Sequence, residues 1–472
     1  MTTTAPAGTA TPARHDSTTP IRHDRASTYR IAVGAGFAGD RYEPAEHLAR
    51  RGDVDALVFE CLAERTIALA QQGLRRGTAP GYDPRILRRL RGSLAPVVEG
   101  GGLVVTNAGV ANPLGAARAV RDLARDLGLR DLPVAAVTGD DVLDRLVLDE
   151  CPVLGTDSTL DEFRDRIVSA NAYTGAAGIA EAIRAGARVV LAGRTADAAL
   201  FLAPLAVRFG WDLDGGGAPV ANGLLVGHLL ECGGQLTGGY YADGPRKTVP
   251  DLARLGFPYA DVTADGHAVY RKLPGTGGRL DTSTVVEQLL YEIEDPQRYV
   301  TPDGVLDLTG VSVGEVGPDE VTAYGATIVD RPEQLKVSVG IDDGFLASAG
   351  IVYAGTGCRS RAELAARVIA ERWVEVHGRP AGELTFDLVG LTSARPFWQP
   401  GDGPEPPEVW LRASARTWSR QDAAILGEEM EALYTNGPAG GGGVTSQVRE
   451  TVGVVSTLVP RSQVETTIEV LA

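Results

Sequence analysis

The sequence predicts an α/β protein in which a large N-terminal domain with a mainly parallel sheet precedes a small C-terminal α+β domain. Between about residues 29 and 193, short apolar strands alternate with helix-like segments, which is the pattern of a parallel sheet. After residue 378 the pattern changes to two strands, a helix and further strands. We therefore expect a disordered tail over residues 1–28 and two domains over residues 29–378 and 379–472.

Length and charge bound the class of protein. The 472 residues exceed what one core usually holds, so we expect two or three domains. Acidic residues outnumber basic ones, 61 to 45, and give a formal net charge of −16 with no long basic run. Nucleic acid and anionic membranes are therefore excluded as partners, and we expect small molecules or other protein chains.

The four cysteines (Cys61, Cys151, Cys232 and Cys358) are widely spaced and form no CxxC pair. This is neither a disulfide framework nor a zinc ribbon, so we expect reduced thiols and no tightly held zinc. No apolar run is long enough for a membrane helix, and the N-terminus lacks the apolar core of a secretory signal. These features predict a cytoplasmic protein.

Polar residues follow each predicted strand of the parallel sheet, and the strands are expected at residues 31–33, 56–59, 103–106, 134–138 and 189–192. Carboxyl ends of parallel strands line one edge, where ligands bind. Glu60, Asn107, Asp140 and Arg194 should therefore approach one another in one cleft. We expect acid or base roles for a set of carboxylates around it: Glu60, Asp140, Asp141, Asp197 and Glu231. Arg194 and Asn107 are expected to orient a carboxylate of the substrate.

The first strand ends in GAGFAGDR (residues 34–41), a literal GxGxxG followed at the next strand end by Glu60. Such a pattern suits a dinucleotide site, with Gly36 allowing close approach of a ligand. The helix start is unusually polar and is interrupted by Pro44. The alternative is a glycine turn that lets strand and helix pack closely.

The segment FECLAERT (residues 59–66) places Glu60, Glu64 and Arg65 where they can share the cleft rim. Burial raises the pKa of one carboxylate while an arginine keeps another ionised, which suits acid–base chemistry. A salt-bridged helix start explains the charges equally well. Cys61 is more typical of a small buried hydrophobe.

The loop TNAGVANP (residues 106–113) offers two amide side chains around a glycine turn. Free N–H groups at the following helix start could hold an oxygen of a substrate, with Asn107 and Asn112 as ligand contacts. The alternative role of Asn112 is that of the helix N-cap, with Pro113 at the first helical position. We favour capping for Asn112 and ligand contact for Asn107.

Residues 171–241 should supply most of the active site. They bring Asn171, Tyr173 and Tyr240 as substrate contacts beside glycines that allow close backbone approach. His228 and Glu231, three apart on a helix, share a face and are followed by Cys232. Zinc would need a third protein ligand, so we favour a polar lining role over a metal site.

A turn at residues 274–278 (PGTGG) lies between lysines, and Lys247 and Gly277 are candidates for binding a phosphate or carboxylate. No Lys-Ser or Lys-Thr pair follows the last glycine, so nucleotide hydrolysis is disfavoured.

Several motifs in one order carry a resemblance to a known family: GAGFAGDR (34–41), FECLAERT (59–66), TNAGVANP (106–113), GRTAD (193–197), HLLECG (228–233) and YTNGPAGGGG (434–443). Together they resemble the acyclic terpene utilisation (AtuA-like) family over nearly the whole chain. The resemblance implies a large α/β domain followed by a small ferredoxin-like domain. It also implies a pathway context, the breakdown of acyclic terpenes beside acyl-CoA carboxylation and hydration, more than a mechanism.

The loop at residues 435–443 contains four consecutive glycines, which are costly to order. We expect Gly440 and its neighbours to reach an N-terminal cleft of the same or a neighbouring subunit, with a floppy hairpin connection as the alternative. A small α+β sandwich leaves one face of its sheet open, and the simplest way to cover that face is the same face of another subunit. We therefore expect a homo-oligomer.

We therefore predict an enzyme of lyase or hydratase type that acts on an acyl-CoA or a carboxylated small molecule, with no cofactor expected. One alternative is a non-catalytic assembly or binding subunit of such a pathway. A second alternative is an NAD(P)-dependent oxidoreductase.

Overall fold

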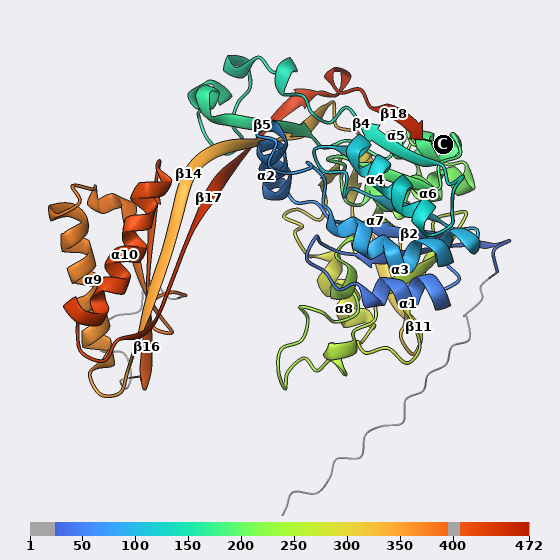
Figure 1. The fold of residues 1–472 in the computed structure, drawn as a ribbon. Coiled ribbons are helices and arrows are strands. Elements are labelled where there is room, and N and C mark those ends of the chain that lie inside the picture. Colours follow the sequence, from blue (N-terminus) through green and yellow to red (C-terminus); the bar gives the residue numbers. More distant parts are fainter. Residues whose placement is uncertain (1–23, 395–405, 472) are drawn as a thin grey trace, which may run out of the picture. The chain divides into compact units, whose positions relative to one another are not determined.

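The computed structural model describes residues 24–394 and 406–471, and the chain divides into two compact units (Figure 1). The large unit takes the chain up to Arg164, Val168–Val339 and the chain from Val455 onward, and the small unit takes Asp165–Ile167 and Gly340–Val454. Most of the tail expected over residues 1–28 and most of a Pro- and Gly-rich stretch of the sequence at residues 400–407 lie outside the described residues. Within the expected tail, Thr28 already begins the first strand.

The large unit is built on a ten-stranded sheet with the order β11-β12-β8-β7-β1-β2-β3-β6-β4-β18. Its centre is parallel and consists of the five predicted strands: β1 (Thr28–Ala35), β2 (Ala56–Phe59), β3 (Leu103–Thr106), β4 (Val134–Thr138) and β6 (Val189–Ala192). These strands are short, rich in valine and buried on both faces, as parallel strands between helices should be. The predicted strands are therefore confirmed.

The expectation of a mainly parallel sheet was wrong, because the sheet is mixed. Antiparallel strands flank the parallel centre: β7 (Pro258–Thr263), β8 (Ala268–Lys272), β11 (Ser312–Gly317) and β12 (Glu320–Tyr324) on one side, and β18 (Thr467–Leu471) on the other. β7 and β8 form a hairpin just before the predicted binding turn at residues 274–278, and β11 and β12 form a second hairpin where no strand was predicted. Short hairpins give a weak periodic signal that is easily missed.

Two rows of helices pack on the parallel strands. One row is α1 (Glu43–Arg51), α3 (Arg85–Glu99) and α4 (Pro113–Asp126), and the other is α5 (Ala177–Arg184), α6 (Ala199–Phe209) and α7 (Ala218–Glu231). Along the sheet, the chain runs from β1 through β2 and β3 to β4 and then turns back to β6, which lies between β3 and β4. Because parallel crossovers are right-handed, this change of direction puts the two rows of helices on opposite faces of the sheet. Ligands bind at the carboxyl ends of strands at such a reversal.

Three further pieces surround that edge of the sheet. Helix α2 (Glu64–Arg75) follows β2, and helix α8 (Thr282–Leu289) begins at a capping box made by Asp281 and Thr284. A separate three-stranded sheet has the order β13-β10-β9, with β9 (Tyr299–Thr301), β10 (Gly304–Asp307) and β13 (Thr327–Asp330). Strand β5 (Ile167–Ala172) pairs with β14 (Gln334–Ala354).

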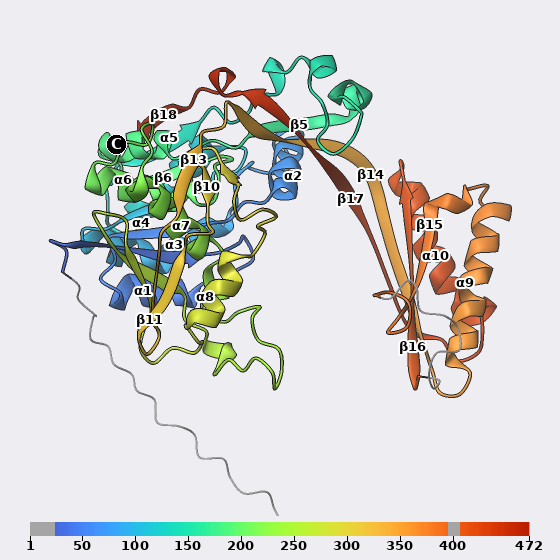
Figure 2. The ribbon, with the colours of Figure 1, turned by 180° about the vertical axis from the view of Figure 1, so that it is seen from behind.

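The small unit has the element order β14-α9-β15-β16-α10-β17 and the strand order β15-β16-β14-β17. Its remaining elements are α9 (Cys358–Glu375), β15 (Leu384–Val389), β16 (Glu408–Thr417), α10 (Arg420–Asn436) and β17 (Gly442–Pro460). Both helices lie on one face of this sheet (Figure 2). They bury a core of their own that includes Ile351, Trp373, Leu411 and Met430.

The small unit begins earlier than the domain boundary expected after residue 378. Strand β14 and helix α9 precede that position and supply half of the small core. The last strand was also misassigned: residues 467–471, expected in the small domain, pair antiparallel with β4 of the large sheet. An alternating strand fits either sheet, and only a pairing distant in sequence decides between them.

Within the described residues, none of the helices combines the length and the apolar character that crossing a membrane requires.

Candidate active site

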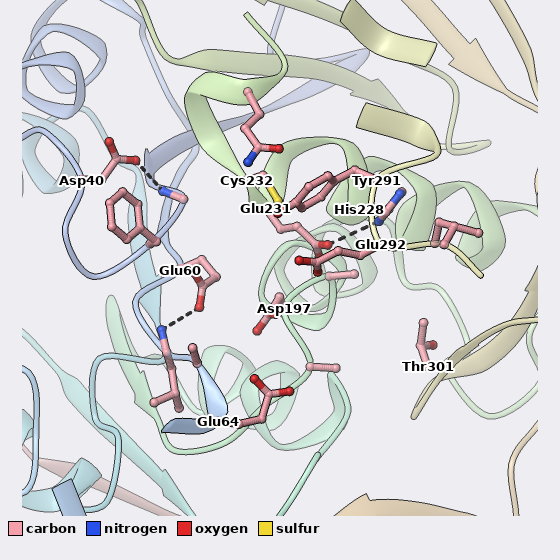
Figure 3. A pocket seen from close by; sticks show the side chains of 18 of the residues that line it. Asp40, Glu60, Glu64, Asp197, His228, Glu231, Cys232, Tyr291, Glu292 and Thr301 are labelled. Carbon is pink, nitrogen blue, oxygen red and sulfur yellow. Dashed lines mark hydrogen bonds and ion pairs between the residues drawn. The ribbon is translucent and has the colours of Figure 1, made fainter. Parts of the chain in front are cut away.

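A cavity of about 750 Å³ lies in the large unit where β1, β2 and β6 end, beside the last turn of α7 (Figure 3). Seven residues predicted from the sequence line it: Gly36, Glu60, Tyr173, Arg194, Asp197, Glu231 and Tyr240. The cavity therefore gathers three of the five predicted catalytic carboxylates.

Glu60 follows β2 and is 7% exposed. Its Oε1 accepts hydrogen bonds from the Leu62 backbone N–H (2.6 Å) and from Asn107 Nδ2 (3.0 Å), while Asn107 Oδ1 accepts from the Cys61 N–H (2.7 Å). Burial, and then the nearby charge of Asp197, raise the pKa of Glu60 well above its usual value. Asn107 thus holds the Glu60 carboxyl group in place without lining the cavity itself.

Arg194 is a buried cation, 1% exposed, at the end of β6. Its Nη1 donates to the Leu62 carbonyl (2.8 Å), and its Nη2 donates to the Thr195 carbonyl and to Asp197 Oδ1. The guanidinium carbon lies 4.4 Å from the ring centroid of Tyr173, a cation–π distance. Burial raises the pKa of Asp197, and the ion pair with Arg194 opposes that rise.

Asp140 does not reach the cavity but holds the strand end behind it. Its Oδ2 accepts from the Arg194 backbone N–H and from Asn171 Nδ2, both at 2.9 Å. Burial raises the pKa of Asp140. Together with the Glu60–Asn107 bond, this confirms that the four predicted strand-end residues come together. Asp140, Asn107 and Asn171 support the site from outside the lining.

Other predicted residues lie away from the cavity lining. Asp141 accepts from Gln71 Nε2 (3.1 Å), and Arg65 is exposed on α2. Asn112 is the N-cap of α4, with its Oδ1 accepting from the Gly115 N–H (2.9 Å), which confirms the capping interpretation.

The polar groups of the predicted anion-binding turn and its lysines are paired with other groups of the protein. Lys247 pairs with Glu287, and Lys272 pairs with Asp319 at 2.9 Å. The Gly277 N–H donates to the Arg254 carbonyl (2.8 Å), so it is already occupied. Gly440 belongs to the small unit, where Arg361 Nη1 donates to the Ala439 carbonyl (2.8 Å), and its predicted contact with a substrate stays a prediction.

His228 and Glu231 face each other on α7, with His228 Nδ1 3.3 Å from Glu231 Oε1. The Leu289 carbonyl accepts from His228 Nε2 (3.0 Å), so that nitrogen carries a proton and Nδ1 faces the carboxyl group. Burial raises the pKa of Glu231 to about 7. Burial lowers the pKa of His228, but the hydrogen bond and charge of Glu231 outweigh it and leave a net rise. The pair therefore shares one proton near neutral pH.

Several lining residues were not predicted. Tyr291, Glu292 and Tyr299 come from the segment after α8, and Lys336 comes from the start of β14. Lys336 Nζ lies 3.4 Å from Glu64 Oε1, and Tyr173 also donates to Glu64. These segments are distant in sequence from the strand ends, and none contains a motif that marks it. Asp40 and Glu64 lay within recognised motifs.

The glycine turn after β1 packs against protein. The Asp40 carboxylate accepts from the Gly36 N–H (2.9 Å) and from the Arg41 N–H (2.8 Å), so these donors are not open to a pyrophosphate. A Cβ added at Gly36 would lie 2.3 Å from the carbonyl carbon of Cys232. This geometry favours the packing interpretation over the dinucleotide site.

Gly36→Ala is expected to lower the free energy of unfolding by about 1–3 kcal/mol, because the neighbour it would strike is the backbone at the end of α7. Chemical denaturation measures the change. The control is Gly314→Ala in β11, where an added Cβ meets only Thr322 Cγ2 at 3.9 Å. Equal stability of the two variants would contradict the close approach.

The pH dependence of stability should report the His228–Glu231 pair. A glutamate whose pKa rises from 4.5 to about 7 on folding holds its proton more tightly in the folded chain, so stability falls as pH rises through that window. The raised pKa of His228 acts in the same direction, since its stabilisation is lost as pH rises. Urea unfolding between pH 5 and 8 should show a shallower decline for Glu231→Gln than for the wild type. Parallel declines would show that Glu231 titrates normally.

Among the described residues, no three His, Cys, Asp or Glu side chains gather in a way that could hold a metal ion. All four cysteines are free.

Comparison with known proteins gives one match. The model of the acyclic terpene utilisation family protein AtuA matches residues 29–470. No curated protein and no solved structure matches the chain.

Proposed function

Because the chain belongs to the acyclic terpene utilisation family, we propose that it is an enzyme that performs acid–base chemistry of lyase or hydratase type on an acyl substrate. One observation carries the proposal. Two carboxyl groups with different partners, the buried Glu60 and the partly exposed Asp197, face the same cavity (Figure 3).

The different partners divide the roles. Glu60 accepts only from neutral donors, Leu62 and Asn107, and these bonds lower its pKa by less than burial raises it. Asp197 is ion-paired to Arg194, which favours its charged form. Glu60 then acts as the general acid and Asp197 as the general base: Asp197 takes a proton from carbon or water, and Glu60 delivers one to the leaving or carbonyl oxygen.

The cavity is large enough for a small organic substrate, and its walls are partly apolar. Phe37, Leu62, Leu255, Phe257 and Ile293 all contribute to the lining. Such walls suit a hydrocarbon chain, as the family name suggests. We propose that the chain of the substrate lies along them, with the reacting carbon between Glu60 and Asp197.

We also propose that the small unit is a ferredoxin-like domain through which the protein forms a homo-oligomer. Support comes from its βαββαβ element order and from the strand order β15-β16-β14-β17, with both helices on one face. Sedimentation analysis of the purified protein tests the oligomer, and a monomer at micromolar concentration would contradict it.

The function is tested by incubating the protein with a panel of acyl compounds, free acids, amides and CoA thioesters, in H₂¹⁸O and in D₂O. Mass spectrometry then detects addition or loss of water and exchange of carbon-bound hydrogen. Turnover that depends on native protein supports the enzyme. Ligand binding without turnover or exchange across the panel would favour the alternative, a binding subunit.

A further inference from the structure

We infer that one end of the cavity, formed by Glu231, Glu292, Tyr240 and Tyr291, binds a protonated amine, so that the substrate class is an acyl compound bearing an ammonium group. This inference rests on the proposed function in taking the same cavity as the substrate site. We call these four residues the acidic–aromatic end. It differs from the expected specificity for a carboxylate or a CoA thioester.

The charge balance of the lining is the first observation. Six carboxyl groups line the cavity against three cations, Arg41, Arg194 and Lys336, and the carboxyl groups belong to Asp40, Glu60, Glu64, Asp197, Glu231 and Glu292. Arg194 is paired with Asp197 and Lys336 with Glu64. Arg41 Nη1 donates to the carbonyls of Leu252 and Ala253.

Neither glutamate of the acidic–aromatic end has an arginine or lysine partner among the residues that the structure describes. The negative charge of Glu292 adds to the effect of burial in raising the pKa of Glu231. An anionic group placed here would meet two glutamates and no arginine or lysine. A cation would relieve their mutual repulsion.

Glu231 supplies a second, independent observation. Its side chain is 12% exposed, and its Oε1 faces His228. Its Oε2 is buried and has no hydrogen-bond partner among the described residues. A buried oxygen without a donor is costly, and an ammonium group brings three donors that would satisfy it.

The aromatic residues are the third observation. The rings of Tyr240 and Tyr291 lie edge to face with centroids 6.3 Å apart, and Tyr240 is 83% exposed at the rim. Aromatic faces beside carboxylates attract ammonium groups through cation–π contacts. Tyr240 (φ 63°) and Glu292 (φ 60°) both have left-handed backbone conformations, which residues other than glycine rarely adopt. Backbone strain of this kind concentrates at ligand sites.

The test uses three ligands of one shape: pentylammonium, pentanoate and pentan-1-ol. Isothermal titration calorimetry at pH 8 and 0.15 M salt measures their affinities for the full-length protein. The wild type should bind pentylammonium roughly tenfold or more tightly than pentanoate, with pentan-1-ol between them. At pH 7, ammonium binding should also release protons, seen as a dependence of the measured heat on the ionisation enthalpy of the buffer.

Two variants locate the effect. Glu231→Gln combined with Glu292→Gln should abolish the preference for ammonium and leave binding of pentan-1-ol within about twofold. Glu99→Gln on α3, which is exposed and lies outside the cavity, should match the wild type and so controls for the acidic surface.

The outcomes separate this inference from the proposed function. Pentanoate binding as tightly as pentylammonium, or a preference that survives in the double variant, overturns the acidic–aromatic end as an amine site. Turnover of CoA thioesters without any preference for ammonium ligands contradicts the amine site alone and leaves the proposed function supported. An ammonium preference that needs Glu231 and Glu292 sustains it, even when no acyl compound in the panel is converted.

Discussion

Replacing Arg194 by methionine is expected to lower the free energy of unfolding of the large unit by about 3 kcal/mol, the low end of the cost of removing one partner from a buried ion pair, because Asp197 is 36% exposed. The guanidinium is 1% exposed and bonds the Asp197 carboxylate and the carbonyls of Leu62 and Thr195. Without it, the partly exposed carboxylate of Asp197 is left beside Glu60 with no arginine partner. Urea denaturation followed by circular dichroism gives the change.

Two companions make the result specific. Arg118→Met on the exposed side of α4 changes the same residue type where burial is absent, and it should be near neutral. Adding Asp197→Asn to Arg194→Met should recover part of the loss, because it removes the stranded charge. If the double variant is no more stable than the single one, the loss comes from packing and not from the uncompensated carboxylate.

Glu60→Gln is expected to reduce kcat by about 10²- to 10⁴-fold on whichever acyl compound the protein converts, the range typical for loss of a general acid. Glutamine keeps an oxygen that can accept from the Leu62 N–H and Asn107 Nδ2, so the fold should be nearly unaffected. Steady-state kinetics and a thermal melt on the same preparation check both statements.

Asp122→Asn provides the control, since its side chain is 69% exposed and lies on α4, outside the cavity. Undiminished kcat in Glu60→Gln would remove Glu60 from the chemistry and leave Asp197 or Glu231 as the remaining candidates for the acid.

The parallel centre of the sheet could be predicted because each of its strands has a clear local signal in the sequence. Ala56–Phe59 and Val189–Ala192 are apolar runs with polar residues immediately after them, and the geometry of parallel sheets then places Glu60 and Arg194 at one edge. The antiparallel flank and the final strand could not be placed in this way. Pairing of Thr467–Leu471 with β4 depends on a partner more than 300 positions earlier, to which nothing local in the strand points.

The site divides along the same line. Residues that directly follow strands, such as Glu60 and Arg194, were predicted, and so was the His228–Glu231 pair from its helical spacing. Asp140 was predicted as catalytic but bonds backbone behind the site, because a residue's position at a strand end does not fix which way its side chain turns. Glu292 and Lys336 enter the cavity only through long-range packing, which no single segment encodes.

The return of β18 to the large sheet has a consequence for the order in which the protein can be completed during synthesis. The small unit, Gly340–Val454 apart from three earlier residues, lies in the chain ahead of this strand. The whole small unit is therefore synthesised while the edge of β4 still lacks its neighbouring strand, β18. An unpaired valine- and alanine-rich edge is a template for association with other nascent chains. Aggregation during overexpression should accordingly be most sensitive to substitutions in residues 467–471, even where the finished protein tolerates them.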